Sequence, residues 1–100
     1  LHSVYHRSNT LVYIMSYQAT LRSNIIAELK RHKDDLDGFL EDMLSPGEIE
    51  AIDERIKIMH ALVAGKTQRE IAEELEISIT TVSRGSRILQ YGRIKEGWRK

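Results

Sequence analysis

The chain has 100 residues, of which 41% are hydrophobic and 30% are charged, a length that suits one small domain. It contains no cysteine, which excludes disulfide bonds, thiolate nucleophiles and cysteine-based metal sites and suits a reducing compartment. One proline and one phenylalanine stand among many leucine, isoleucine, glutamate, arginine and lysine residues, so we expect an all-α fold. A chain this short without disulfides must be stabilised by helix packing or by a partner subunit.

The charges are unevenly distributed although their sum is zero. Residues 77–100 carry six basic side chains and one acidic side chain, a net charge of +5, so the first 76 residues sum to −5. A basic end on an acidic chain is typical of a surface that binds a polyanion such as nucleic acid. It is also typical of terminal cations that simply face solvent.

The first 14 residues follow no helical period and precede Met15. We interpret residues 1–14 as a non-native or disordered leader, and residues 15–100 as a single domain. No apolar run approaches the roughly 18 residues that span a bilayer, and the start lacks the pattern of a secretory signal. We therefore expect a cytoplasmic protein.

Apolar spacing predicts two helices in the first half of the domain. The first follows Ser16 and carries the stripe Leu21, Ile25, Ile26 and Leu29. The second is shorter and carries Leu36, Phe39, Leu40, Met43 and Leu44. Gly38 weakens the prediction of the second helix, because glycine is a poor helix former.

Ser45-Pro46-Gly47-Glu48 predicts the start of a long third helix. Ser45 can cap the free amides, Pro46 suits the first helical position, and Glu48 can complete a capping box. The helix has a heptad-like apolar seam: Ile49, Ile52, Ile56, Met59 and Val63. Such a seam fits a dimer interface, and core packing within one chain fits it equally well. Gly65 supplies a left-handed stop.

Residues 67–84 predict two short helices joined by a tight turn. Thr67 to Glu70 is a second capping box, and Ser78 can cap the second of these helices. Four apolar residues would bury the angle between the helices, and small Ala72 would let them approach closely: Ile71, Leu75, Ile77 and Val82. The pattern resembles the helix-turn-helix of bacterial DNA-binding proteins, whose second helix enters the major groove.

On this interpretation the predicted DNA-binding residues are Gln68, Arg69, Ile79, Thr80, Thr81, Ser83, Arg84 and Arg87. The hydroxyl groups would read base edges or phosphates, the apolar groups would touch thymine methyls, and the cations would pair with phosphates. An ordinary corner between two helices, with its hydroxyl groups in solvent, is the alternative.

Two positions depart from the generic helix-turn-helix pattern. Glu76 stands where glycine usually eases the turn, so we expect slight strain there. Gly85 lies in the middle of the second helix, where glycine costs about 1 kcal/mol relative to alanine. The space beside Gly85 could admit a flat ligand next to Arg84, but the periodicity itself favours close helix packing or a kink.

The chain resembles the Trp repressor family from about Leu36 to Leu89. The matching residues are Leu44-Ser45-Pro46, Glu48, Arg55, Gln68-Arg69-Glu70, Arg84-Gly85-Ser86 and Leu89. The resemblance implies an all-helical, intertwined homodimer that binds a palindromic operator in double-stranded DNA. It also implies that L-tryptophan is the corepressor. We expect no other cofactor.

The resemblance further implies an effector site that includes Ser45, Arg55, Arg84, Gly85 and Ile88. Arg55 and Arg84 would sandwich the indole ring, Arg84 and Ser45 would hold the carboxylate, and backbone carbonyls near Asp42 and Leu44 would receive the ammonium group. Gly85 would leave room for the ring. Ile88 stands where the family often has a small hydroxylated residue, so it directs apolar bulk toward the pocket.

The histidines and acidic residues show no metal-ligand spacing, no phosphate loop occurs, and no catalytic arrangement follows from spacing, so we expect neither an enzyme nor a metal site. Trp98, four residues after Ile94, is interpreted as a packing anchor of a short terminal helix. The leading hypothesis is a ligand-responsive transcriptional repressor. The alternatives are a related DNA-binding protein with a different effector or none, and a helical module for dimerisation or protein binding.

Overall fold

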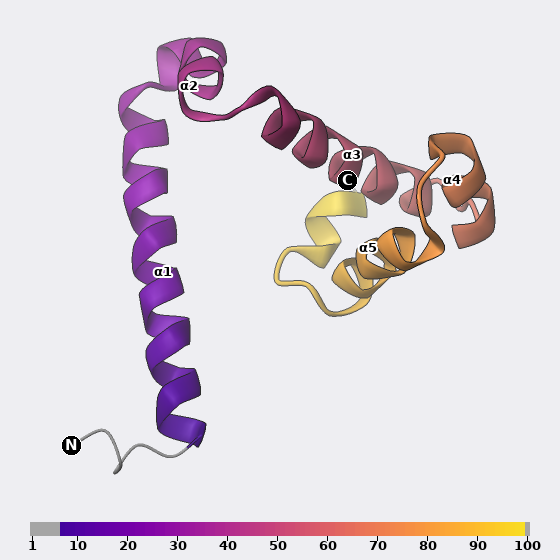
Figure 1. The fold of residues 1–100 in the computed structure, drawn as a ribbon, viewed down its shortest axis with the longest axis horizontal. Coiled ribbons are helices and arrows are strands. Elements are labelled where there is room, and N and C mark those ends of the chain that lie inside the picture. The colour runs from indigo at the N-terminus through magenta and orange to yellow at the C-terminus, as the bar shows by residue number, and fades with distance from the viewer. Residues whose placement is uncertain (1–6, 100) are drawn as a thin grey trace. The chain divides into compact units, whose positions relative to one another are not determined.

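The computed structural model describes residues 7–99, and within them the regular elements are all helices (Figure 1). This confirms the all-α fold class. No helix in this part of the chain is both long and apolar enough to cross a membrane. The helices divide into two compact units, residues 1–43 and residues 44–100, and each is described by itself. The division falls inside the segment 15–100 that the sequence assigns to one domain.

The first unit begins with a helix that is longer than the sequence predicts. α1 spans Arg7–Arg31, so residues 7–14 are helical rather than a disordered leader, and residues 1–6 lie outside the described part. The apolar side chains from Leu11 to Met15 are about half exposed or more and form no one-sided stripe, which is why periodicity missed them. The helix can continue there because no glycine or proline precedes Gly38.

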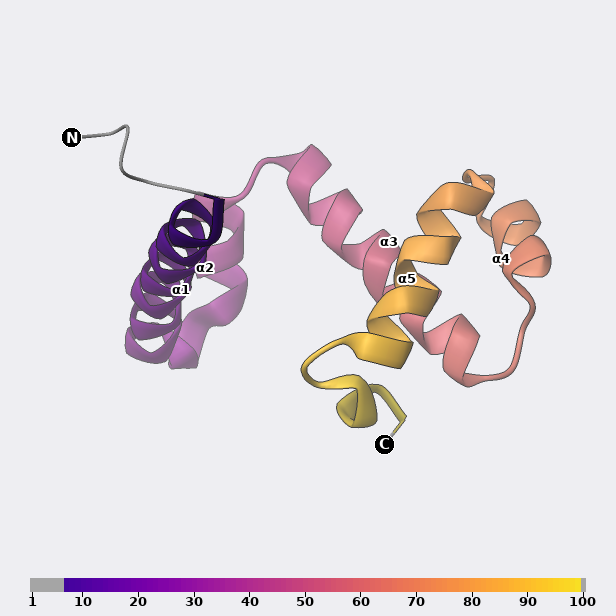
Figure 2. The same ribbon diagram turned by 90° about the horizontal axis from the view of Figure 1, so that it is seen from below.

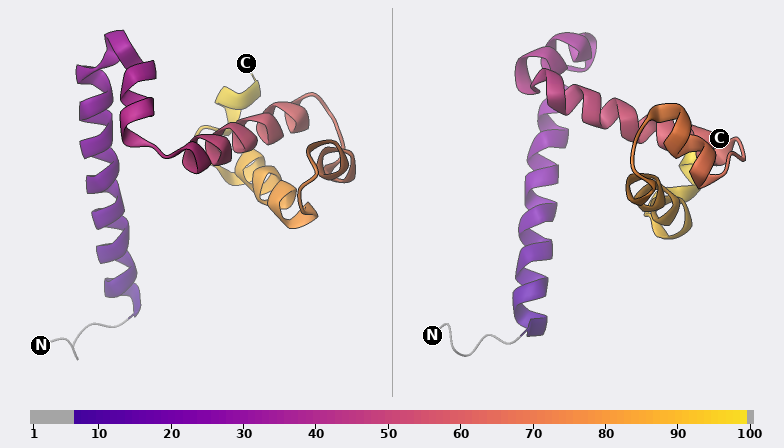
Figure 3. Two further views of the ribbon diagram at one scale, coloured as in Figure 1. Left: turned by 45° about the horizontal axis from the view of Figure 1, so that its top comes forward. Right: turned by 45° about the vertical axis from the view of Figure 1, so that its right-hand side comes forward.

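The chain reverses after α1 through a short 3₁₀ turn, η2 (Lys33–Asp35), and enters α2 (Leu36–Met43), as Figure 3 shows. The Gly38 amide donates a hydrogen bond of 2.9 Å to Oδ1 of Asp35, which supports the start of α2. His32 and Phe39 stack with their ring centroids 5.5 Å apart. The predicted short second helix is therefore present, and Gly38 lies within its first turn.

The second unit begins with α3 (Pro46–Val63), whose start follows the predicted capping box. The Glu48 amide donates to the Ser45 hydroxyl at 3.2 Å, and the Ser45 amide donates to Oε1 of Glu48 at 2.8 Å. The Ser45 backbone amide, and after it the Ser45 hydroxyl, hydrogen-bond to the Glu48 carboxylate and lower the pKa of Glu48 below its ordinary value of 4.5. The helix ends at Val63, and Gly65 has a φ of 93°, which confirms the predicted left-handed stop.

Two shorter helices complete the motif, α4 (Gln68–Leu75) and α5 (Ile79–Tyr91). Thr67 and Glu70 form the second capping box, with bonds of 2.9 and 3.1 Å. The Ser78 hydroxyl accepts from the Thr81 amide at 3.2 Å and caps α5. All three helix starts are therefore those that the capping residues predict.

The core of the second unit lies where α3, α4 and α5 meet (Figure 2). Ile58 of α3, Ile71 of α4 and Val82 of α5 are each at most 2% exposed. The residues packed against them are Ala61, Leu62, Ala72, Leu75 and Ile77. The four apolar residues predicted to fill the helix-turn-helix angle are thus in the core or against it.

The apolar seam of α3 divides along its length. Met59 is buried and Val63 is half-buried, so the C-terminal part of the seam packs within the unit. Ile49, Ile52 and Ile56 are 38–41% exposed. The seam therefore has residues for core packing within the chain, and it also has exposed residues that could form a dimer interface.

A C-terminal 3₁₀ helix, η3 (Lys95–Arg99), packs against α3 and α5. The ring of Trp98 meets His60 edge-on, with centroids 6.1 Å apart. The Lys95 ammonium donates to the carbonyl of Gln90 at 3.2 Å, near the end of α5. Trp98 is half-buried, as expected for a packing anchor.

The turn between α4 and α5 stores strain at Glu76, whose backbone is left-handed at φ 56° and ψ 46°. Glu76→Gly is expected to raise the free energy of unfolding by about 0.5–1 kcal/mol, because glycine adopts this conformation without a steric penalty. Urea denaturation would measure the change. Glu73→Gly, in the exposed interior of α4, is the control and should instead cost about 1 kcal/mol. Equal losses in both variants would show that Glu76 is not strained.

Candidate nucleic-acid interface and adjoining pocket

The two helices of the motif are tied together by a side-chain hydrogen bond. The Ser83 hydroxyl of α5 donates to Oε1 of Gln68 in α4 at 2.7 Å, and both residues are half-buried. Both were predicted to contact DNA. With its proton committed to Gln68, the Ser83 hydroxyl fixes the approach of the two helices, and nothing in its surroundings supports the predicted role in reading bases.

Thr81 lies on the side of α5 that lines a pocket rather than on its outer side. Its side chain is half-buried, its hydroxyl lies 2.8 Å from the Ser78 hydroxyl, and it lines the pocket described below. The predicted role of Thr81 in base reading therefore lacks support in the geometry. Periodicity assigned Thr81 and Ser83 to a helix but did not show which face of that helix packs.

The solvent-facing side of α5 carries Thr80, Arg84 and Arg87, at spacings of four and three. Ile79 begins the helix and is 49% exposed, and Arg69 is exposed on α4. None of these three arginines is in an ion pair within residues 7–99. The face thus offers cations, a hydroxyl group and an apolar group to a partner, and five of the eight predicted DNA-binding residues lie on it or beside it.

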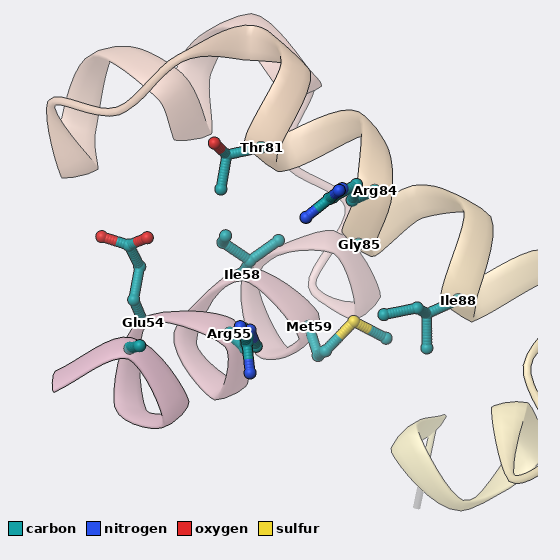
Figure 4. Close-up of a pocket in the computed structure, with 9 residues that line it drawn as sticks. Glu54, Arg55, Ile58, Met59, Thr81, Arg84, Gly85 and Ile88 are labelled. Carbon is teal, nitrogen blue, oxygen red and sulfur yellow. The ribbon is translucent and has the colours of Figure 1, made fainter. Parts of the chain in front are cut away.

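A pocket of about 400 Å³ lies between α3 and α5 (Figure 4). Its lining residues are Ala51, Glu54, Arg55, Ile58, Met59, Thr81, Arg84, Gly85 and Ile88. Four of the five residues predicted for an effector site are therefore together. Ser45 is the exception, because it does not line this pocket and its hydroxyl accepts from the Glu48 amide in the capping box.

Gly85 is buried at the crossing of α5 and α3, where a side chain would not fit. A Cβ atom built at Gly85 would lie 2.6 Å from Cγ2 of Ile58 and 3.4 Å from Cδ1 of Leu62. The Ile58 methyl group branches from Cβ and has little freedom to move away. The close helix packing that periodicity favours is confirmed, and it accounts for the glycine without any ligand.

Glu54 is the pocket residue of chemical interest that sequence reasoning missed. Ala51, Glu54 and Ile58 follow one another at spacings of three and four, so they share one face of α3 with the buried core. Ile58 was not identified as a core residue from the sequence, and Glu54 was assigned no role. The periodic position of Ile58 was the signal that could have revealed the burial of Ile58 and the place of Glu54 on the same helix face.

Comparison with known proteins gives matches to one family. The family model described as Trp repressor protein matches residues 20–96. The Trp operon repressor homolog of Xylella fastidiosa (strain M23) is 40% identical over 68 residues, which are 67% of this chain and 74% of that protein. The Trp operon repressor homolog of Photobacterium profundum is 40% identical over 60 residues, 59% of this chain and 56% of that protein. No solved structure gives a significant match.

Proposed function

We propose a reading of DNA that starts from one premise: this chain belongs to the Trp repressor family and is therefore a non-enzymatic, DNA-binding transcriptional regulator. In this proposal the chain forms a homodimer, and helix α5 of each copy reads one half of a palindromic operator. The observation that carries the proposal is the solvent-facing side of α5. Thr80, Arg84 and Arg87 project from a helix whose start is capped by Ser78 and whose back is packed on α3 and α4. A helix held in this way can enter a major groove as a rigid body. The protein would then act in the cytoplasm, where its DNA partner lies.

The contacts proposed for DNA fall into two kinds. Arg69, Arg84 and Arg87 form no ion pair within residues 7–99, and their positive charges suit phosphates, which supply affinity without sequence information. Thr80 and Ile79 stand at the N-terminal end of α5, where a recognition helix touches base edges, so they are the proposed readers of sequence.

The homodimer is proposed from the N-terminal part of the α3 seam. Ile49, Ile52 and Ile56 recur at helical spacing and remain more than a third exposed, and a second copy of the chain would cover them. Two α5 helices related by a twofold axis would meet successive major grooves about 34 Å apart. Inverted half-sites in the DNA are the consequence.

The pocket between α3 and α5 is the proposed effector site, with L-tryptophan as the first ligand to test. Arg84 both lines the pocket and lies on the DNA-facing side of α5, so a ligand bound there would touch the reading helix directly. A related regulator with a different effector is the second candidate. The observation that favours it is Ile88, which lines the pocket with an apolar side chain that is 44% exposed.

Selection from randomised DNA duplexes tests the DNA-binding proposal and the dimer together. The parent protein should select two inverted half-sites, and Thr80→Ala should change the preferred base at about one or two positions in each, worth about 1–3 kcal/mol. Ser83→Ala, the matched control, should lower stability by about 1 kcal/mol through the lost bond to Gln68 and leave the preferred sequence unchanged.

Three results would contradict this proposal. Selection of DNA that contains only one half-site would show that the protein does not bind as a dimer. A change of preference in Ser83→Ala with none in Thr80→Ala would show that another face of α5 reads the DNA. Binding that does not weaken as salt concentration rises would point to an apolar protein interface instead.

A further inference from the structure

Three charged side chains line the pocket without pairing with one another. Glu54 and Arg55 come from α3 and Arg84 comes from α5, and none of them is in an ion pair within residues 7–99. Figure 4 shows the Glu54 carboxylate at one side of the pocket with Ile58 next to it, Met59 farther along near Ile88, and Arg84 reaching down from α5. The pocket thus holds two positive charges and one negative charge at separate places on a partly apolar wall.

This distribution is complementary to a zwitterion. A ligand carboxylate pairs with guanidinium groups, and an ammonium group pairs with a carboxylate. The apolar wall of Ile58, Met59 and Ile88 would cover a side chain that is not charged. An acid without an ammonium group would offer no positive charge to the Glu54 carboxylate. The two negative charges, one on the ligand and one on Glu54, would then repel each other.

We propose that Glu54, in place of the backbone carbonyls near Asp42 and Leu44 that the family resemblance implies, receives the ammonium group of the effector. This makes the pocket selective for an amino acid over the corresponding acid that lacks the amino group. The inference rests on the proposed effector site and adds to it a residue that determines specificity. Glu54 comes from the same chain as both arginines, so one chain supplies partners for both charges of the ligand. Half-burial favours the interaction, because a partly desolvated carboxylate binds a cation more strongly than one in open water.

The test compares two ligands with the same ring and carboxylate, L-tryptophan and indole-3-propionate, by titration calorimetry on the full chain. The parent should bind L-tryptophan more tightly than indole-3-propionate. Glu54→Gln keeps the size of the side chain and removes its charge, so it should weaken L-tryptophan binding about 10-fold or more. The same variant should bind indole-3-propionate as well as the parent does, or better. Thermal unfolding would confirm that the variant folds.

Glu50→Gln is the matched control, because it removes an equal charge one turn earlier on α3 from a residue outside the pocket. Neither ligand should lose affinity in this variant. Unchanged L-tryptophan binding in Glu54→Gln would overturn the proposal, and so would an equal loss of both ligands. If the parent binds neither ligand, both this inference and the proposed effector site fail, while the DNA selection described above still decides the regulatory function separately.

Discussion

Gly85→Val is expected to lower the free energy of unfolding by about 2–3 kcal/mol and to impair DNA binding and ligand binding together. The reason is the crossing of α3 and α5, where even a Cβ atom would lie 2.6 Å from the Cγ2 methyl of Ile58. Valine adds two further methyl groups at the same point, so α5 must move away from α3. That movement displaces Arg84, which serves both the pocket wall and the solvent-facing side of α5.

Urea denaturation of Gly85→Val and of Gly47→Val would measure the effect. Gly47 is the control because it lies in the first turn of α3 with no atom within 4 Å of its Cβ position, so valine meets no neighbour there. The packing explanation would be wrong if Gly85→Val unfolded at the same urea concentration as the parent and lost only ligand binding. In that case Gly85 would serve to keep a ligand slot open.

Ile71→Ala is expected to cost about 2–5 kcal/mol of stability, the usual range when a fully buried isoleucine is truncated. Ile71 is 0% exposed and packs with Ile58 and Val82 in a core made from only three helices, so little other apolar packing compensates. A loss of this size is a large part of the stability of a small unit. Differential scanning calorimetry would show it as a lower melting temperature.

Ile79→Ala makes the same chemical change at a residue that is 49% exposed. It should alter stability by no more than about 0.5 kcal/mol, as is usual for a surface substitution. Its effect should instead be on the DNA sequence selected, because Ile79 begins the proposed recognition helix. If Ile79→Ala were as destabilising as Ile71→Ala, then Ile79 would be part of a packed interface, and another residue would have to touch the bases.

The starts and ends of the helices in the second unit are predictable from the sequence because the interactions that set them are local. Ser45 with Glu48, and Thr67 with Glu70, exchange hydrogen bonds over three residues, so residue type and spacing are enough. The stop at Gly65 and the strain at Glu76 depend on the backbone conformation of single residues. The long α1 was only partly predicted, because its first turns lack the one-sided apolar stripe on which the prediction depended.

The all-α class, the capped helix-turn-helix and the residues that fill its angle follow from hydrophobic periodicity and capping chemistry, which are properties of neighbouring residues. The side of α5 that faces solvent, in contrast, is set by the tertiary structure. This structure turned Ser83 toward Gln68, placed Gly85 against Ile58, and brought Glu54 into the same pocket as Arg84. Each of these contacts depends on how one helix crosses another, and crossing is set by the packing of whole helix faces rather than by any short segment.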